Sequence, residues 1–508
     1  MKNLKNLLLS KVPIVILLIL MQLGWFLWIF KKLRNQAHWV NFALGVLTVL
    51  MFLAILMSNQ NPSYKIGWIV LIGVVPLLGG LLYLLFGNKR PARRLQNKIL
   101  AAEARLDSLA AQDPKLLKGI SERDAGLSRY ILSAGAYPIS GQTKTEYFKL
   151  GEEMFERMLE DLNSAENYIF FEYFIVGESS MWERMKEVLI RKAKAGLDVR
   201  VMYDELGSLP VLPQNFRRDL TAAGIQVVNF NPLVPFLSMV MNNRDHRKIL
   251  SIDGRVAYTG GINIADEYIN INPPYGHWKD TGLRLEGEGA WTLTTMYLGL
   301  WLANLEDEID YSTYRPELTP DLTETENLGL VQPFSDSPLG QEALGLNVYL
   351  DIIWQAEDYV YIFTPYLIID YEMIEALSLA ARRGVDVRIV VPGIPDKKLA
   401  YELTQSYFRI LLEAGVKIYL YSPGFIHAKS FLSDHKRAVV GTINMDFRSL
   451  YLHFECGVLM LDTPCLKDLH EDYLDVFAKS KLLSLEDLAK NPLVQMKRAV
   501  LRVVSTMF

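Results

Sequence analysis

The chain has 508 residues, half of them hydrophobic, and a formal net charge of −4. This length predicts about three domains, and the negative charge provides no global basic field that would recruit nucleic acid. The two cysteines, Cys456 and Cys465, form neither a disulfide framework nor a zinc pattern, so we interpret them as buried thiols. The hydrophobic excess is concentrated in the N-terminal part of the chain.

Three long apolar segments lie in that part, at about 12–30, 39–57 and 66–86. Each is long enough to cross a hydrocarbon core of about 30 Å as a helix. A cleaved signal peptide is the alternative for the first segment, but no small-residue cleavage site is visible. The pattern therefore predicts a membrane domain at 1–90 with two or three transmembrane helices.

Positive charges around these segments predict their orientation. Lys and Arg cluster at 31–34 and at 89–98, whereas the loop at 58–65 has only Lys65. Because basic loops stay in the cytoplasm, we expect a multi-pass protein of the cell membrane whose larger part faces the cytoplasm. Three spans would leave the N-terminus outside, and two would leave it in the cytoplasm. The cluster at 89–98 also predicts contact with anionic lipid head groups.

The remaining chain consists of a basic helical connector at 91–135 and two similar halves at 136–320 and 321–508. The sequence Gly-Leu-Asp-Val-Arg-Val at 196–201, for example, matches Gly-Val-Asp-Val-Arg-Ile at 384–389. Apolar strand patterns alternate with helical patterns in each half, which predicts an α/β fold with mixed sheets flanked by helices. We expect the two homologous halves to pack face to face about a pseudo-twofold axis.

A short His-x-Lys-x4-Asp motif occurs once in each half. Its residues are His246, Lys248 and Asp253 in the first half and His427, Lys429 and Asp434 in the second. An Asn follows each His at the same offset, at Asn263 and Asn444. Two copies with matching offsets are very unlikely to arise by chance. Packing of the halves would bring both motifs into one site, and neither half is expected to be competent alone.

The spacing of the motif suits reactions of phosphate esters. Side chains two apart on a strand share a face, so each His and its Lys point the same way. The Lys can hold non-bridging oxygens while the imidazole meets phosphorus or the leaving oxygen. Two imidazoles can divide nucleophilic attack and proton transfer between them, so we expect no metal and no cofactor. We assign all six motif residues to the catalytic set, and expect the two Asp mainly to organise their hairpins.

A carboxylate follows each motif at a comparable distance, Asp280 in the first half and Glu455 in the second. A nucleophilic imidazole needs one ring nitrogen tied to an acceptor, so we interpret these acids as His-orienting groups. Ordinary strand-edge acids are the alternative. The two Asn are expected to bind phosphate. We interpret the other histidines as structural or surface residues: His38, His277, His435, His453 and His470.

The doubled motif and its downstream Asn resemble the phospholipase D superfamily and, within it, the bacterial cardiolipin synthases. Other similar segments lie at 170–175, 364–366, 381–388, 424–429 and 441–449. The resemblance implies an enzyme that joins two phosphatidylglycerols into cardiolipin and releases glycerol through a phosphatidyl-histidine. It also implies that His246 is the nucleophile and His427 the acid/base.

Other functions are compatible with the same motifs. A phospholipase D-type hydrolase would use water as acceptor, and a non-catalytic membrane scaffold is a second alternative. A superfamily nuclease is disfavoured by the apolar segments and the negative charge. The expected partners are phosphatidylglycerol and anionic membrane lipids, with no nucleic acid, and the oligomeric state is left open.

The halves differ just before the motif. An apolar segment at 233–241 precedes His246, and nothing similar precedes His427. We interpret it as a lipid-entry or bilayer-contacting segment, with a buried loop as the alternative. The basic, apolar tail at 492–508 is interpreted as a docked C-terminal helix, with an interfacial helix as the alternative.

Overall fold

The computed structural model describes residues 21–22, 24–25, 28, 37–58, 60–87, 93–107, 112–232, 243–304, 311–317, 328–340, 342–489, 491–503 and 505. The chain divides into two compact units. One comprises residues 1–89, 233–242 and 499–508, and the other comprises 90–232 and 243–498. The predicted lipid-entry segment at 233–241 and most of the first apolar segment lie outside the described residues.

Three helices follow one another in the N-terminal unit: α3 (Ala37–Met57), α4 (Pro62–Val74) and α5 (Pro76–Phe86). The third predicted span, 66–86, is therefore two helices. The chain turns at Val75, with φ −134°, and Pro76 opens α5, where a residue without an N–H is tolerated. Among the described residues, no helix is both long and apolar enough to cross a membrane. The expected transmembrane helices are thus not confirmed.

The larger unit begins with helices and continues into a first sheet. Among the described residues, this first sheet has seven strands in the order β1-β8-β6-β5-β2-β3-β4. Strands β2, β3 and β4 run parallel, and the others pair antiparallel. The strands are β1 (Thr143–Phe148), β2 (Tyr168–Tyr173), β3 (Asp198–Asp204), β4 (Gln226–Phe230), β5 (Ile249–Ile252), β6 (Val256–Gly260) and β8 (Gly282–Gly287). The helices are α6 (Arg93–Asp107), η1 (Leu116–Gly119), α7 (Glu122–Gly135), α8 (Gly151–Ser164), α9 (Ser180–Lys194), α10 (Glu205–Ser208), α11 (Phe216–Ala222), η2 (Asp266–Ile269), α12 (Glu288–Asn304) and η3 (Tyr311–Tyr314).

The second sheet repeats this order. Its described residues form eight strands, β19-β13-β12-β10-β15-β16-β18-β9, so that only β19 is additional. The strands are β9 (Leu330–Asp336), β10 (Tyr359–Phe363), β12 (Asp386–Pro392), β13 (Lys417–Tyr421), β15 (Ser430–Ser433), β16 (Arg437–Gly441), β18 (Glu455–Leu461) and β19 (Ser480–Leu482). The helices are α13 (Leu344–Gln355), α14 (Tyr371–Arg382), α15 (Lys398–Glu413), α16 (Phe447–Tyr451), α17 (Leu466–Ala478), η5 (Leu485–Asp487) and α18 (Pro492–Val503). A separate pair joins β11 (Leu367–Ile368) to β17 (Met445–Asp446). The predicted α/β fold of two similar halves is confirmed.

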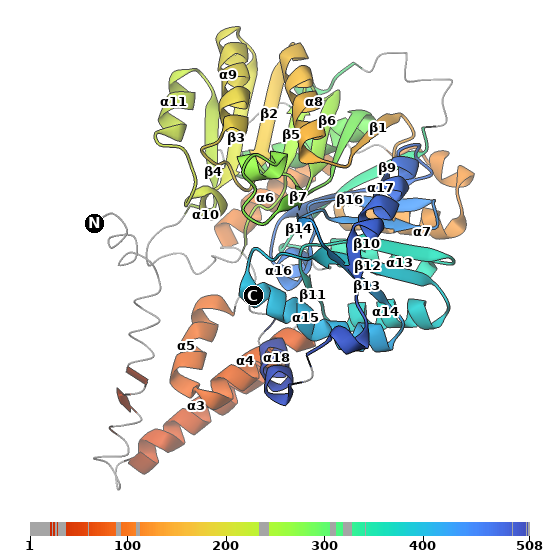
Figure 1. The fold of residues 1–508 in the computed structure, drawn as a ribbon. Coiled ribbons are helices and arrows are strands. Elements are labelled where there is room, and N and C mark those ends of the chain that lie inside the picture. The colour runs from red at the N-terminus through yellow and green to blue at the C-terminus, as the bar shows by residue number, and fades with distance from the viewer. Residues whose placement is uncertain are drawn as a thin grey trace. The chain divides into compact units, whose positions relative to one another are not determined.

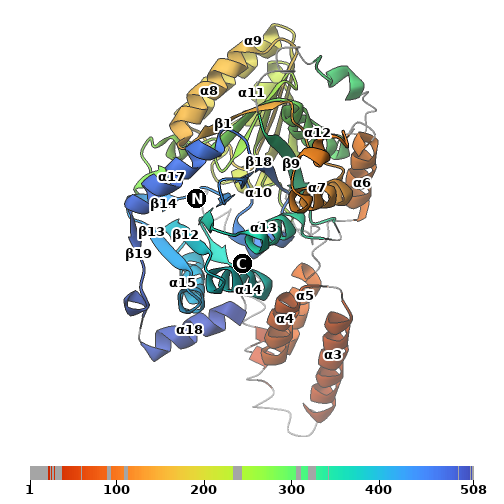
Figure 2. The same cartoon turned by 90° about the vertical axis from the view of Figure 1, so that its right-hand side faces the viewer.

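The two halves share one hydrophobic core. Strand β16 contacts β6 and β8, and β18 contacts β6. Buried side chains of both halves meet there, among them Ile249, Ala257, Leu285, Leu432, Val440 and Val458. Removal of this apolar surface from water stabilises the packed halves. Figure 1 and Figure 2 show the first half in yellow to green and the second in cyan to blue, side by side in both views.

Two short parallel connections also join the halves, next to the motifs. Strand β14 (Gly424–Ile426) pairs with β7 (His277–Lys279), and Asp245 forms a single bridge with Phe454. In each connection, the segment that leads into a motif His in one half lies beside the segment that leads into a carboxylate in the other. This register decides which acid meets which imidazole.

Candidate active site

Each motif histidine is paired with a carboxylate from the opposite half. Nδ1 of His246 lies 2.9 Å from both carboxylate oxygens of Glu455, and Nδ1 of His427 lies 2.7 Å from Oδ2 of Asp280. The acids were predicted as His-orienting groups, but the crossing was not. It depends on the register between the halves, which no local pattern encodes.

Backbone hydrogen bonds fix this crossed arrangement. The His246 N–H donates to the Phe454 carbonyl at 2.9 Å, and the His427 N–H donates to the Lys279 carbonyl at 2.7 Å. Because each motif His is held by the residue next to the partner acid, its ring is oriented from two directions. The Nδ1–carboxylate contact leaves Nε2 of each ring for the substrate.

The two pairs sit in different electrostatic settings, although all four groups are buried. Burial and then Lys248 lower the pKa of His246 well below its usual range. Burial is also the main cause that lowers the pKa of His427, to about 4. Burial raises the pKa of Glu455 well above its ordinary value. Burial acts the same way on Asp280, but His427 and Lys429 outweigh it, and the pKa of Asp280 lies below its ordinary value.

The motif lysines are buried beside their own histidines. Nζ of Lys248 donates to the His246 carbonyl at 2.7 Å, and Nζ of Lys429 donates to the His427 carbonyl. Burial lowers the pKa of Lys248 to about 8 and that of Lys429 to about 7. These ammonium groups supply the positive charge that a phosphodiester requires.

The two downstream asparagines have different surroundings. Asn263 accepts the Ile175 N–H through Oδ1 at 3.1 Å and donates through Nδ2 to the Tyr268 hydroxyl at 2.8 Å. The Tyr268 ring in turn lies 5.5 Å from the His427 ring. Asn444 is buried, and among the described residues its Oδ1 has no hydrogen-bond partner. Their assignment to phosphate binding stays a prediction.

The motif aspartates lie at turns, away from the histidines. Asp253 accepts three backbone N–H groups of residues 166–168, each at 2.8 Å. Asp434 accepts three N–H groups of residues 357–359 at 2.9 to 3.0 Å. Both adopt positive φ, 52° and 54°, a conformation that Asp tolerates better than most residues. The carboxylates therefore hold the turn to its own sheet and do not reach the catalytic groups.

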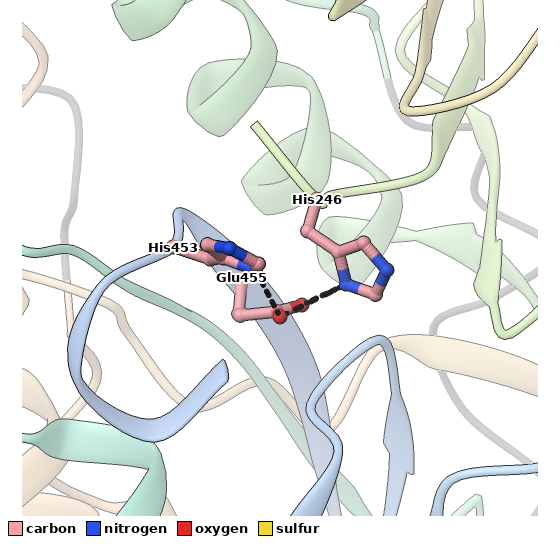
Figure 3. Close-up of side chains that lie close together, drawn as sticks. All are labelled: His246, His453 and Glu455. Atoms are coloured by element: carbon pink, nitrogen blue, oxygen red, sulfur yellow. Dashed lines mark hydrogen bonds and ion pairs between the residues drawn. The ribbon is translucent and has the colours of Figure 1, made fainter. Parts of the chain in front are cut away.

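Two further residues, not predicted from the sequence, surround Glu455. Thr442 donates through Oγ1 to Oε2 at 2.5 Å. His453, interpreted above as structural or at the surface, has Nδ1 3.8 Å from Oε1 and a ring centroid 5.7 Å from that of His246. Figure 3 shows the two imidazoles on either side of the Glu455 carboxylate. The sequence feature that could have identified His453 as part of the site is its position two residues before Glu455.

Among the described residues, His246, His453 and Glu455 offer nitrogen and oxygen atoms within 4.8 Å of one another. Two imidazoles and a carboxylate are a donor set that suits a transition metal. The Nδ1 and carboxylate atoms of this set already bond to each other.

Comparison with known proteins decides the family. Residues 158–273 and 349–479 match the model described as cardiolipin synthase, PLD-like domain, and residues 46–88 match the phospholipase D-nuclease N-terminal model. A cardiolipin synthase of Geobacillus sp. (strain WCH70) is 35% identical over 488 residues, which cover 94% of this chain and 96% of that protein. The chain belongs to the cardiolipin synthase family. The prediction of a phosphatidyltransferase of this type is confirmed.

The chain is also similar to other proteins. A cardiolipin synthase of Alkalihalophilus pseudofirmus is 36% identical over 440 residues, 86% of each chain. An uncharacterized protein of Streptococcus mutans is 44% identical over 436 residues, 85% of this chain and 94% of its own. A crystal structure of phosphatidylserine synthase from Haemophilus influenzae superposes with a TM-score of 0.56 at 16% identity, and covers 75% of this chain and 100% of its own. That likeness shows a shared fold.

Proposed function

We propose that this member of the cardiolipin synthase family transfers a phosphatidyl group from one phosphatidylglycerol to another and releases glycerol. The observation that carries the proposal is the pair of buried, crossed His–carboxylate contacts. Two imidazoles allow two successive displacements at phosphorus, one ring holding the phosphatidyl group while the other moves protons. The reaction needs no nucleotide-activated lipid, because the bond energy of the phosphodiester is conserved in the intermediate.

In the first displacement, Nε2 of His246 attacks phosphorus and a nitrogen–phosphorus bond forms. The bond from phosphorus to the glycerol head group breaks, and His427 donates a proton to the departing oxygen. The pKa of His427 is about 4 in the free site, so the bound anionic phosphodiester, together with Asp280, has to favour its protonated form for this step. Glycerol leaves, and a phosphatidyl-His246 remains. The ammonium groups of Lys248 and Lys429 offset the negative charge on the non-bridging oxygens.

The second displacement reverses these roles. His427, now neutral, removes the proton from a terminal hydroxyl of a second phosphatidylglycerol. That oxygen attacks phosphorus, the bond to His246 breaks, and cardiolipin is formed. The enzyme returns to its starting protonation state.

The two acids support this division of labour. The pKa of Asp280 lies below its ordinary value, so an ionised carboxylate faces His427 and stabilises its imidazolium form. Glu455 has a raised pKa, and therefore does not favour a proton on Nε2 of His246. Environments that push two titratable groups apart in this way identify the acid and the base. The nucleophile is accordingly His246.

Action on phospholipids associates the enzyme with a membrane. We infer that it is a multi-pass protein of the cell membrane. Its parts are a membrane domain at 1–90, a basic helical connector at 91–135 and two homologous halves at 136–320 and 321–508, both of which face the cytoplasm. The apolar segments and the flanking Lys and Arg residues support this topology, as does the family match at residues 46–88. Contact of the basic cluster at 89–98 with anionic lipids belongs to the same proposal.

Product analysis tests the reaction. The purified full chain is given phosphatidylglycerol with labelled phosphate, in the absence of nucleotides, and the lipids are separated. Cardiolipin and free glycerol in equal amounts are expected. Phosphatidic acid as the sole product would identify a hydrolase that uses water as acceptor, and would contradict the transferase.

A further inference from the structure

The residue two positions before each catalytic carboxylate differs between the halves. The first half has Trp278, whose ring lies 5.5 Å from that of His427. The second has His453, whose ring lies 5.7 Å from that of His246. The tilts are also similar, 48° and 44°. The two rings thus occupy corresponding places, but only the second can bind a proton.

The His453 side chain is 11% exposed, but both of its ring nitrogens are shielded from solvent and have no hydrogen-bond partner among the described residues. Nδ1 instead faces Oε1 of Glu455 at 3.8 Å, as Figure 3 shows. Buried polar atoms of this kind are uncommon and call for a specific explanation, such as a partner acquired during a reaction.

Glu455 provides that partner. Both of its oxygens face Nδ1 of His246 at 2.9 Å, and Oε2 also accepts from Thr442. Attack through Nε2 requires the ring proton of His246 on Nδ1, so Glu455 has to accept on that side. Burial raises the pKa of Glu455, so this acid holds a proton more readily than an exposed carboxyl, and a proton on Glu455 must point away from the Nδ1–H of His246. Oε1 on the side of His453 is the place for it.

We propose that His453 is a positioning residue that takes the proton of Glu455 when phosphatidyl-His246 forms. Formation of the nitrogen–phosphorus bond places positive charge on the His246 ring. The proton then passes from Oε1 of Glu455 to Nδ1 of His453, and the resulting carboxylate accepts the Nδ1–H of the charged ring. The proton returns when the second lipid removes the phosphatidyl group, so the enzyme neither gains nor loses an atom. This inference rests on the proposed phosphatidyl-histidine step.

The surrounding charges keep the proton on Glu455 until that step. Burial is the main cause that lowers the pKa of His453, and several cations add to it: Arg448, Lys248, Arg244 and Lys397. Glu455 faces Lys248, and also Asp446, which acts in the opposite sense. A neutral His453 is therefore an acceptor in the resting enzyme. Positive charge on His453 becomes favourable only beside an ionised Glu455.

The test compares the pH dependence of kcat in three proteins: the wild type, His453→Asn and Trp278→Phe. The asparagine cannot take a proton, so Glu455 would have to release its proton to solvent. We expect an unchanged KM and a kcat about 10²-fold lower at pH 7, the scale of a lost proton-transfer partner. The difference in kcat between His453→Asn and the wild type should become smaller as pH rises, because Glu455 then loses its proton to solvent more easily. Trp278→Phe, the matched control in the first half, should change kcat by one factor at every pH.

Two results would overturn the proposal: a deficit in His453→Asn that is equal at all pH values, or no deficit. His453→Gln gives the same test if the asparagine variant does not fold, as judged by thermal melting. Failure of the proposed function is a separate result, because it is seen in the wild type as phosphatidic acid in place of cardiolipin. The histidine adduct precedes both products, so total turnover still reports on His453.

Discussion

At the residue scale, the charge of each catalytic group depends on what the opposite half presents to it. Asp280 faces His427, with which it forms a hydrogen bond, and the Lys429 ammonium, and both groups keep its pKa low in spite of burial. Glu455 also faces an ammonium group, that of Lys248, but there burial outweighs it and the pKa is raised. The pKa values of two similar carboxylates are therefore shifted in opposite directions, and the proposed difference in role between the histidines rests on this contrast.

Exchange of each carboxylate for its amide should show this difference. Asp280→Asn is expected to lower kcat by about 10³- to 10⁴-fold, since an amide neither stabilises the His427 imidazolium nor selects its tautomer. Glu455→Gln should cost only about tenfold to 10²-fold, because the glutamine resembles the protonated acid. Turnover on phosphatidylglycerol, with melting curves as the folding control, measures both. Equal losses would contradict the assignment of His427 as acid/base.

The lysines predict an alkaline limit for substrate capture. The pKa values of Lys429 and Lys248 are about 7 and about 8, so both are charged at acid pH and lose charge as pH rises through this range. Because kcat/KM reports the free enzyme, it should fall between about pH 7 and 9. Lys429→Arg, which stays protonated, should move the fall to higher pH. An unchanged profile in this variant would show that Lys429 does not set the limit.

At the element scale, the strands and helices of each half could be predicted from local sequence patterns, but the pairing between the halves could not. The apolar strands and the repeated Gly-x-Asp-Val-Arg segments indicated two matching sheets, which the strand orders confirm. Pro76 lies within an apolar run that continues across it and predicts one span, whereas in the structure α5 begins at this residue. The crossing of acids and histidines depends on β14 pairing with β7 and on the Asp245 bridge. Such contacts join residues far apart in the chain, so residue patterns do not reveal them.

The turn aspartates belong to this scale. Asp253→Ala removes the acceptor of three backbone N–H groups and places Ala at positive φ. We expect a loss of about 2–4 kcal/mol in the free energy of unfolding, with the turnover of the folded protein largely kept. Asp434→Ala is the matched variant in the other half and should behave alike. Normal stability combined with lost turnover would show that Asp253 acts in the chemistry.

At the scale of the whole molecule, duplication produced one site rather than two. The sheets share a core, and each half supplies an imidazole to one pair and a carboxylate to the other. A single site could be inferred from the repeat alone, because one imidazole per half suits a reaction that needs two. The difference in electrostatic setting between the two His–carboxylate pairs could not be inferred from the repeat, because it arises from buried charges whose neighbours lie in the other half.

Mixing of inactive variants tests whether one chain holds the complete site. His246→Asn and His427→Asn should each be inactive, and an equimolar mixture, co-purified after joint expression, should remain inactive. Each chain in such a mixture still lacks one imidazole. Recovery of roughly a quarter or more of wild-type turnover would mean that a partner chain supplies a histidine.

The central claim is that a phosphatidyl group is carried on His246 while His427, oriented by Asp280 from the other half, moves protons. Mass spectrometry of peptides from enzyme quenched during turnover of phosphatidylglycerol tests it directly, under alkaline conditions that preserve phosphoramidates. The account predicts a phosphatidyl adduct on the peptide that contains His246, which disappears when unlabelled acceptor lipid is added in excess. An adduct on the His427 peptide, with none on His246, would contradict it.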